Sequence, residues 1–439
     1  MKIGFVSLGC PKNQLDTEVM LHELVTAGYE ITADETEADI VVINTCAFIE
    51  SAKQEAIDNI IDIGWLKENR SLKGIIVTGC LAERYRDDIF EELPEVDAVL
   101  GVGSIHSIVD AVRSVEKKER FSEYLDKECV RLGGDRVLTT PEYQAYIKIA
   151  EGCDNKCTYC AIPSIRGKFR SRPIEDIVAE AKQLESLGVR ELCVVAQDTT
   201  RYGLDLYGKY SLAELLQRIT KETTIPWIRL MYCYPDKITD ELIAEIRDND
   251  RILKYIDLPL QHVSDNMLKR MNRHGDGATV REVVASLRRE IPDIVIRTTF
   301  IVGFPGETEE DFCELCEFVE EVKFEHMGAF TYSREEGTPA YDLDGQIDEQ
   351  IKQDRLDILM RSQLDINEAR NKALIGRTLT VLCEDFDVCS ETYFGRSYMD
   401  APEIDGKIFF TSKKKLKSGE FVQVKIDYAE DYDLIGKVI

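Results

Sequence analysis

The chain has 439 residues, 44% of them hydrophobic, which is enough for two or three domains with separate cores. Its 82 acidic and 55 basic residues give a net charge of −27, which argues against broad binding to a nucleic-acid backbone. That charge is compatible with a basic protein partner, or with an acidic surface that only maintains solubility. No apolar run reaches the ~18 residues of a membrane span, and the first apolar segment does not resemble a signal peptide.

Short β-rich runs alternate with helical periodicity up to residue 116. Alternation of this kind predicts an N-terminal α/β domain, residues 1–116, with a parallel sheet covered by helices. The expected strands are 2–8, 39–44, 73–78 and 96–102, and the expected helices are 14–27, 49–68, 83–92 and 104–116.

Three cysteines follow three of these strands at the point where each strand ends. They are Cys10, Cys46 and Cys80, and Gly9 and Gly79 precede two of them. Parallel strands bring their carboxyl ends to one edge of the sheet, where open α/β sheets bind ligands. A single cysteine at a strand end is usually a buried structural residue. Three in register favour a set of metal ligands over that alternative.

A second alternation follows residues 117–141, a charged segment without periodicity that we expect to be a linker. Six βα units within residues 142–375 predict a barrel of the TIM type that does not close completely. The expected strands are 145–150, 191–196, 227–232, 255–260, 295–302 and 326–331. The expected helices are 174–187, 212–220, 240–247, 265–271, 279–290 and 309–322, and a long polar helix over 346–372 ends the domain.

The first barrel strand leads into a loop with three closely spaced cysteines, Cys153, Cys157 and Cys160. Thiolates suit zinc or iron-sulfur clusters. A closed zinc site needs four ligands, and no nearby histidine or fourth cysteine completes such a set. Three cysteines on a 4Fe-4S cluster leave one iron free to bind a substrate or cofactor. We therefore favour a cluster over zinc or over unligated thiols.

Polar residues follow other strands at the same mouth of the barrel. Gln197 and Asp198 follow the second strand, Gln261 and His262 the fourth, and a loop that begins at Gly303 the fifth. These groups suit an amino acid or ribose ligand, although a histidine such as His262 is more often structural.

A short basic run beyond the cysteine loop contacts an anionic ligand or is simply solvated. The run consists of Arg166, Lys168, Arg170 and Arg172.

The 13 cysteines form no short disulfide framework, which favours a reducing, cytoplasmic location. Cys313 and Cys316 fall inside an expected helix without a partner pair, so we expect unligated thiols there. Cys193 and Cys233 are expected to pack in barrel strands. The remaining cysteines, for which the pattern indicates no role, are Cys129, Cys383 and Cys389.

The C-terminal residues 376–439 predict a small all-β barrel of the OB type. The expected strands are 378–383, 392–396, 406–410, 421–427 and 434–439. Such barrels often bind nucleic acid, but this one is acidic on balance, and its basic residues cluster only at positions 413–417. Direct binding of nucleic acid is therefore not expected, whereas a basic protein is an acceptable partner.

The loop of Cys153, Cys157 and Cys160 at a barrel mouth is similar to the signature of the radical S-adenosylmethionine (SAM) enzymes. With the N-terminal cysteines and the small C-terminal barrel added, the whole chain resembles the methylthiotransferases, whose last domain is called TRAM. The resemblance implies two 4Fe-4S clusters: the loop cysteines hold the one that binds SAM, and an auxiliary cluster handles sulfur.

The same resemblance assigns site residues. It implies that the auxiliary cluster is held by Cys10, Cys46 and Cys80. It places Tyr159 against the adenine of SAM. Further candidate SAM contacts are Gln197, Asp198 and Gly303.

Within the family, the segments 7–13, 151–154 and 255–262 are similar to the type that methylthiolates an aspartate of the twelfth small-subunit ribosomal protein. The tRNA-modifying type usually has Gln-Met-Asn after its first cysteine and Pro-Val-Gln-Ser-Gly at the fourth strand. Neither form occurs here. Methylthiolation of a tRNA adenosine stays the alternative, and a two-cluster electron carrier is the remote one.

The implied chemistry follows from the bond to be broken, because the β-hydrogens of an aspartate are too weakly acidic for a side-chain base. One SAM would methylate sulfur on the auxiliary cluster. A second SAM would be cleaved reductively to a deoxyadenosyl radical that abstracts the hydrogen, after which the carbon radical takes the methylthio group. The cleavage needs a low-potential electron donor such as flavodoxin or ferredoxin.

Overall fold

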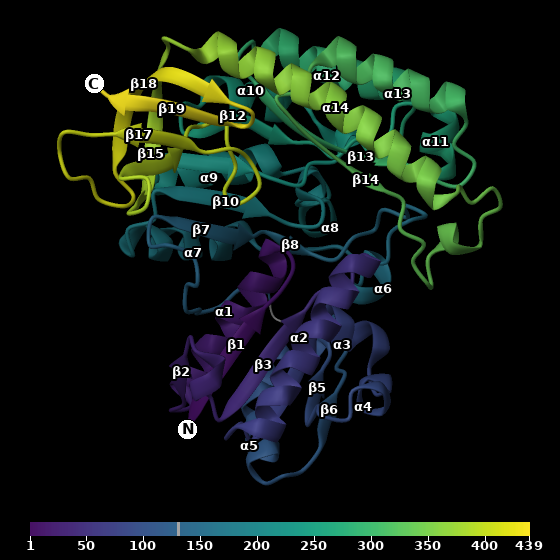
Figure 1. The fold of residues 1–439 in the computed structure, drawn as a ribbon, viewed down its shortest axis with the longest axis vertical. Helices are drawn as coiled ribbons and strands as arrows, with labels where there is room; N and C mark the ends of the chain where they lie inside the picture. The colour runs from purple at the N-terminus through teal and green to yellow at the C-terminus, as the bar shows by residue number, and fades with distance from the viewer. Residues whose placement is uncertain (130–131) are drawn as a thin grey trace.

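The computed structural model describes residues 1–129 and 132–439. In its first part, six parallel strands form a sheet in the order β2-β1-β3-β4-β5-β6. Figure 1 shows this domain at the bottom, in purple and blue. The strands are β1 (Lys2–Ser7), β2 (Glu30–Thr32), β3 (Ile40–Thr45), β4 (Gly74–Gly79), β5 (Ala98–Leu100) and β6 (Phe121–Glu123). The four expected strands are present. The strands β2 and β6 were not expected, and β6 lies in the expected linker.

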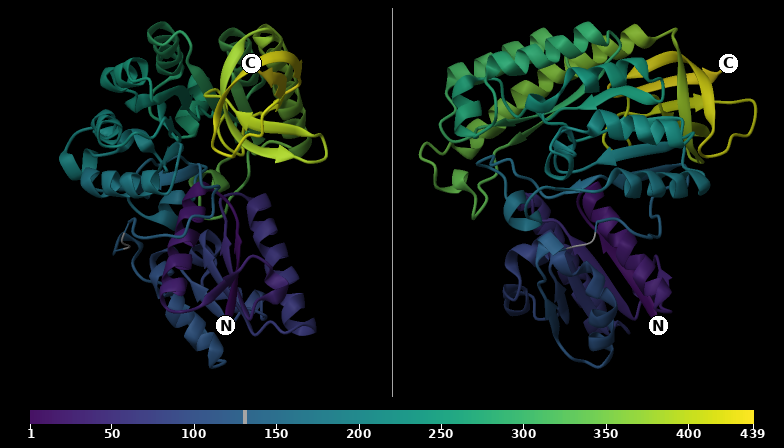
Figure 2. Two further views of the ribbon diagram at one scale, coloured as in Figure 1. Left: turned by 90° about the vertical axis from the view of Figure 1, so that its left-hand side faces the viewer. Right: turned by 180° about the vertical axis from the view of Figure 1, so that it is seen from behind.

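Helices cover both faces of this sheet, as the two further views show (Figure 2). They are α1 (Pro11–Thr26), α2 (Glu50–Asn69), α3 (Cys80–Tyr85), α4 (Asp88–Glu92) and α5 (Ile108–Glu116), with 3-10 turns η1 (Glu35–Glu37), η2 (Val102–Ser107) and η3 (Lys127–Cys129). The prediction of one helix over 83–92 is wrong. The chain breaks at Arg86, whose φ of 48° lies in the left-handed region and cannot continue a right-handed helix.

The central sheet is an open barrel of six parallel strands in the order β14-β13-β12-β11-β10-β7. These are β7 (Gln144–Lys148), β10 (Glu191–Val195), β11 (Trp227–Leu230), β12 (Ile252–Asp257), β13 (Val295–Val302) and β14 (His326–Thr331). Since β7 and β14 are the two ends of the order, the barrel is incomplete, as expected.

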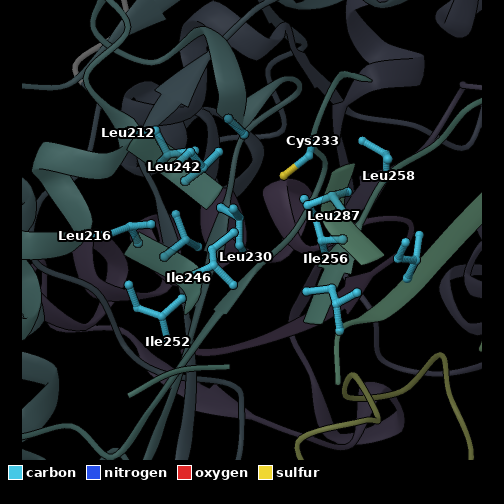
Figure 3. Close-up of a cluster of buried hydrophobic side chains, with 14 of the residues drawn as sticks. Leu212, Leu216, Leu230, Cys233, Leu242, Ile246, Ile252, Ile256, Leu258 and Leu287 are labelled. Atoms are coloured by element: carbon cyan, nitrogen blue, oxygen red, sulfur yellow. The ribbon is translucent and has the colours of Figure 1, made fainter. Parts of the chain in front are cut away.

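Most helices of this domain pack on one face of the central sheet, whereas the first, Ile162–Arg166, packs against α3 of the N-terminal domain. The helices are α6 (Ile162–Arg166), α7 (Ile174–Ser186), α8 (Leu204–Tyr207), α9 (Leu212–Glu222), α10 (Asp240–Asp248), α11 (Asp265–Arg270), α12 (Gly277–Glu290), α13 (Glu309–Val322) and α14 (Glu349–Leu374), with turns η4 (Thr199–Arg201), η5 (Pro235–Lys237) and η6 (Pro339–Asp342). Figure 3 shows part of the core between them, where Leu216 and Ile246 of the helices meet Leu230 and Ile256 of the strands.

Two strands differ from their expected bounds at the barrel mouth. The run 145–150 is interrupted at Ile149, and a short strand β8 (Ala150–Glu151) pairs with β9 (Arg170–Ser171). The fourth strand ends at Asp257, three residues earlier than expected, so Gln261 and His262 lie in a loop beyond it. Pro259 supplies no backbone N–H and is disfavoured in a central strand.

The C-terminal strands close into the expected small barrel, in the order β15-β16-β17-β19-β18. They are β15 (Thr378–Asp387), β16 (Thr392–Arg396), β17 (Ile408–Thr411), β18 (Phe421–Glu430) and β19 (Asp433–Val438). Alternate residues of a strand face opposite sides of a sheet. Thus Tyr146 and Tyr255 of the central sheet turn away from the helices and pack with residues of the small barrel such as Phe410.

The small barrel and the N-terminal domain lie at opposite ends of the central strands (Figure 1). At the amino ends, Glu191 forms ion pairs with Arg229 at 2.7 Å and with Arg396 of the small barrel at 2.6 Å, and all three side chains are buried. The carboxyl ends face the N-terminal sheet. In the described part of the chain, no helix is long and apolar enough to span a membrane.

Candidate functional site

The first three site cysteines, Cys10, Cys46 and Cys80, are called the strand-end trio here. They follow β1, β3 and β4, which are direct neighbours in the first sheet, so the three loops share one edge. Gly9 and Gly79 both have φ of 91°, in the left-handed region that favours glycine. A Cβ at Gly9 would lie 2.8 Å from the Cβ of Cys46, so a larger residue there would push the trio apart.

Two asparagines tie the loops of the strand-end trio together. The Asn13 amide donates hydrogen bonds to the Leu8 carbonyl at 3.1 Å and to the Thr45 carbonyl at 2.7 Å. The Asn44 amide donates to the Asn13 carbonyl at 2.8 Å. The Asn13 Oδ1 is 3.7 Å from the Sγ of Cys80. The start of α1 is therefore fixed against both neighbouring strand ends.

Two cations give the strand-end trio an electropositive environment. Burial disfavours the thiolate of Cys10. The charges of Lys12 and Arg166, together with backbone hydrogen bonds, outweigh this effect and hold the pKa of Cys10 below its ordinary value. Burial raises the pKa of Cys80 to about 11, against the opposing effect of Arg166, whose Nη2 is 3.5 Å from the Cys80 Sγ.

The loop trio, Cys153, Cys157 and Cys160, lies between β8 and α6 at the carboxyl end of the first barrel strand. Gly152 has φ of 80° and packs against the Lys168 carbonyl, where a Cβ would clash. The Asn155 amide donates to the Asp198 carboxylate at 2.8 Å, which anchors the loop to the second strand.

The loop trio lacks the strong cationic environment of the strand-end trio. Burial raises the pKa of Cys153 and of Cys160 to about 12, and the neighbouring cysteines raise both further. These mutual effects also indicate that the loop thiols lie close to one another. Without a metal to stabilise the thiolates, both are thiols at neutral pH.

The donor sets fit iron-sulfur clusters better than a single zinc ion. Both are made of cysteine alone, which is the ligand type of iron-sulfur clusters. Among residues 1–129 and 132–439, no three His, Cys, Asp or Glu side chains converge closely enough to hold one metal ion. A 4Fe-4S cluster does not need such convergence, because each cysteine binds a different iron.

The expected SAM contacts lie around the loop trio, but several are already engaged by protein groups. The Tyr159 hydroxyl accepts a hydrogen bond from Arg273 at 3.1 Å. Asp198 is buried and accepts from Asn155 at 2.8 Å and from the Thr200 hydroxyl at 2.6 Å.

Gln197 leaves a polar atom available to a ligand, whereas Gly303 is closely packed by a side chain. The Gln197 Nε2 donates to Glu151 at 2.5 Å, while its buried Oε1 has no hydrogen-bond partner within the described residues. Gly303, with φ of 70°, packs so closely on Lys352 that a Cβ would clash. Of the four expected SAM contacts, Gln197 therefore presents an acceptor that a ligand amine would satisfy.

His262 takes the structural role that is usual for a buried histidine. Its Nε2 lies 3.2 Å from a Glu307 oxygen, and its Nδ1 accepts the backbone N–H of Ser264 at 3.1 Å. Both ring nitrogens are engaged and the side chain is fully buried.

The basic run beyond the cysteine loop is half buried and half solvated. Arg166 and Arg172 are buried and ion-paired, whereas Lys168 is exposed. Arg170 donates to the carbonyls of residues 127 and 128. The solvated alternative therefore holds for Lys168 but not for the two buried arginines.

A buried network of charges lies beside the strand-end trio, and its carboxylates were not expected. Arg166 Nη1 pairs with Asp16 at 2.6 Å and lies 3.5 Å from Glu151. Lys148 pairs with Asp16 at 2.7 Å and with Glu151 at 2.6 Å. Since Asp16 belongs to α1 and the other three to the barrel domain, the network joins the domains. We call this contact region the seam (Figure 1).

The other cysteines lie apart from both trios. Cys193, Cys233 and Cys383 are buried, and Cys389 is exposed. Cys313 and Cys316 lie on α13, the first exposed and the second half-buried. The side chain of Cys129 lies outside what the structure describes.

Three families match successive parts of the chain. An uncharacterized protein family, UPF0004, matches residues 2–101, the Radical SAM superfamily matches 147–319, and the TRAM domain matches 375–439. The radical SAM match covers the barrel with the loop trio at its mouth, so the class that fold and site define is a radical SAM enzyme. Membership of this superfamily implies SAM and a 4Fe-4S cluster.

Curated relatives extend over the whole chain. It is 51% identical to "Ribosomal protein uS12 methylthiotransferase RimO" of Thermoanaerobacter sp. (strain X514), over 99% of each chain. It is 52% identical to the protein of the same name from Desulforamulus reducens, again over 99% of each. The chain belongs to the RimO family of radical SAM methylthiotransferases.

Among solved structures, the chain resembles the radical S-adenosylmethionine methyltransferase TsrM from Kitasatospora setae, with a TM-score of 0.57. The two are 15% identical, and the match covers 77% of this chain and 76% of the other. At this identity the likeness shows the fold alone.

Proposed function

We propose that this protein transfers a methylthio group to the β-carbon of an aspartate in ribosomal protein uS12. The observation that supports the proposal most is that Arg166, from the barrel domain, contacts Cys80 of the strand-end trio and pairs with Glu151, which lies two residues before the loop trio. The names of the full-length relatives support the choice of uS12 as the substrate. A net charge of −27 suits a basic ribosomal protein.

The proposal assigns each trio a 4Fe-4S cluster. Cys153, Cys157 and Cys160 would hold the cluster that binds SAM, and the strand-end trio would hold the auxiliary one. When bound, SAM and the two clusters supply the radical and the sulfur chemistry.

The residues of this chain position these groups and keep water away. Asn155 fixes the loop trio to the second strand, Asn13 and Asn44 fix the strand-end trio, and Gln197 offers a free acceptor to SAM. Cys80, Cys157 and the charged network are buried and the other four cysteines are half-buried, which limits the access of water to a site where reactive species form. The chain thus contributes orientation and enclosure.

The proposed partners follow from the same reaction. Besides uS12, a low-potential electron donor such as flavodoxin or ferredoxin would reduce the cluster that binds SAM. We place the reaction in the cytoplasm, where ribosomal proteins and such donors occur together.

Mass spectrometry of uS12 tests the proposal. The reconstituted protein is incubated anaerobically with SAM, a reductant and uS12, and separately with bulk tRNA. We expect a methylthio mass increase on one aspartate of uS12 and none on tRNA. Modification of tRNA with unmodified uS12 would overturn the proposal in favour of the tRNA alternative.

A further inference from the structure

Lys12 is a buried cation at the seam that no carboxylate neutralises. Lys12 stands two residues after Cys10, on the first turn of α1, and is 7% exposed. Its ammonium lies 3.2 Å from the centre of the Tyr232 ring. The charged and titratable groups that act on it most are Tyr232, Cys10 and Arg166. Within the described ranges, no Asp or Glu forms an ion pair with Lys12.

The other cations of the seam are balanced or hydrogen-bonded. Arg166 and Lys148 share Asp16 and Glu151, so two positive charges meet two negative ones. A buried charge without a counter-ion is costly unless a ligand supplies one. Lys12 has no carboxylate in this network, and the groups that favour its charge are Tyr232 and the Cys10 thiol.

Arg273 also lacks a carboxylate, yet its donors have acceptors. It donates to the Tyr159 hydroxyl at 3.1 Å and to the Pro259 carbonyl at 2.8 Å. Lys12, by contrast, contacts the face of an aromatic ring, which attracts the ammonium without accepting all its hydrogen bonds. Lys12 therefore keeps donors available to a ligand.

The barrel domain fixes Tyr232 for this contact at a conformational cost. Tyr232 has φ of 58°, which is unfavourable for a non-glycine residue. Its backbone N–H donates to Asp257 at 2.9 Å, and its carbonyl accepts from the Thr199 N–H at 3.0 Å. Strained residues that are held in this way cluster at functional sites. Here the strained residue directs a ring from the barrel mouth toward the Lys12 ammonium.

Lys12 lies beside the strand-end trio and contacts Tyr232 of the barrel domain. In the proposed reaction, the β-carbon of an aspartate must come close to both trios, and its carboxyl carbon is one bond away. We infer that Lys12 binds this carboxylate through a charge-assisted hydrogen bond and so selects an acidic side chain for modification. The inference rests on the proposed function and adds the residue that reads the reacting side chain.

Binding measurements test the inference without relying on turnover. The full chain, with both clusters reconstituted, is titrated anaerobically with labelled uS12 and with uS12 whose modified aspartate is replaced by asparagine. We expect the unmutated enzyme to prefer the aspartate form by about 10- to 100-fold, the range for a hydrogen bond to a charged group. Lys12→Met should bind both forms equally, and Lys12→Arg should retain part of the preference.

A matched control uses Lys168→Met, which removes an exposed lysine of the cysteine-loop region and should leave the preference unchanged. Iron content and the visible spectrum check that each variant holds its clusters. An undiminished preference in Lys12→Met would overturn the inference. If Lys12→Met loses iron, Lys12→Arg decides, and loss of iron or of the preference in that variant would also overturn it.

Failure of the inference and failure of the proposed function remain distinguishable. If the unmutated enzyme does not modify uS12, the proposed function is wrong. If it modifies uS12 but Lys12→Met still prefers the aspartate form, only the role of Lys12 is wrong.

Discussion

The two cysteine trios differ in how the fold builds them and in their electrostatic surroundings. The loop trio comes from one short segment, and the strand-end trio from three neighbouring strands. Burial raises the pKa of Cys153 to about 12 and also raises those of Cys46 and Cys80, whereas Lys12 and Arg166 hold the pKa of Cys10 below its ordinary value. The cations beside the strand-end trio suit a site that holds additional anionic sulfur. The less cationic loop trio suits a site whose open iron binds SAM.

The difference also shows how the domains depend on one another. Arg166 belongs to the barrel domain but contacts Cys80, and Lys12 belongs to the N-terminal domain but contacts Tyr232 of the barrel. The barrel domain thus completes the surroundings of the strand-end trio on the N-terminal domain. Their assembly, and not either sheet alone, forms the reaction space.

The largest effect is expected from the loop trio. Cys153→Ala should abolish both deoxyadenosine formation and methylthiolation, because radical generation precedes every later step. Anaerobic assays with SAM and a reductant, analysed by chromatography, measure the first product. Deoxyadenosine formation at the unmutated rate would show that the loop trio does not hold the SAM cluster.

A substitution in the strand-end trio is expected to abolish only the final product, methylthiolated uS12. Cys46→Ala should abolish methylthiolation of uS12 but leave deoxyadenosine formation measurable, since the loop trio is intact. The iron content should fall by about half, as one of two equal clusters is lost. Equal loss of both products would contradict the division of roles between the trios.

A smaller effect, on stability, is expected at the seam. Arg166→Met leaves Asp16 and Glu151 with Lys148 as their shared counter-ion, and removal of one partner from a buried ion pair costs about 3–5 kcal/mol. Chemical unfolding monitored by circular dichroism would show the loss. The exposed control Lys168→Met should change the free energy of unfolding by no more than about 0.5 kcal/mol.

The smallest effect is expected from a substitution in the pair Cys313 and Cys316, which lies outside both trios. Cys313→Ser changes an exposed thiol on α13, so stability should change by no more than about 0.5 kcal/mol. Iron content should equal that of the unmutated protein. A clear loss of iron would reveal a third set of ligands.

Much of the site could be predicted because its signals are local. The spacing of Cys153, Cys157 and Cys160 is visible within one loop, and Cys46 and Cys80 each follow a strand in which every residue is buried. The break at Arg86 and the three-residue strands β2 and β6 were missed, because the contacts that stabilise them come from distant segments.

By itself, the sequence determined the order of the three domains, the parallel sheets and the six cysteines that carry the proposed chemistry. Periodicity and spacing are properties of short segments, and they survive without knowledge of the neighbours. Only the tertiary structure decided that Lys12, Asp16, Lys148 and Arg166 meet at the seam. In the sequence these are ordinary charged residues, and their roles arise because packing removes them from water and sets which charges are balanced.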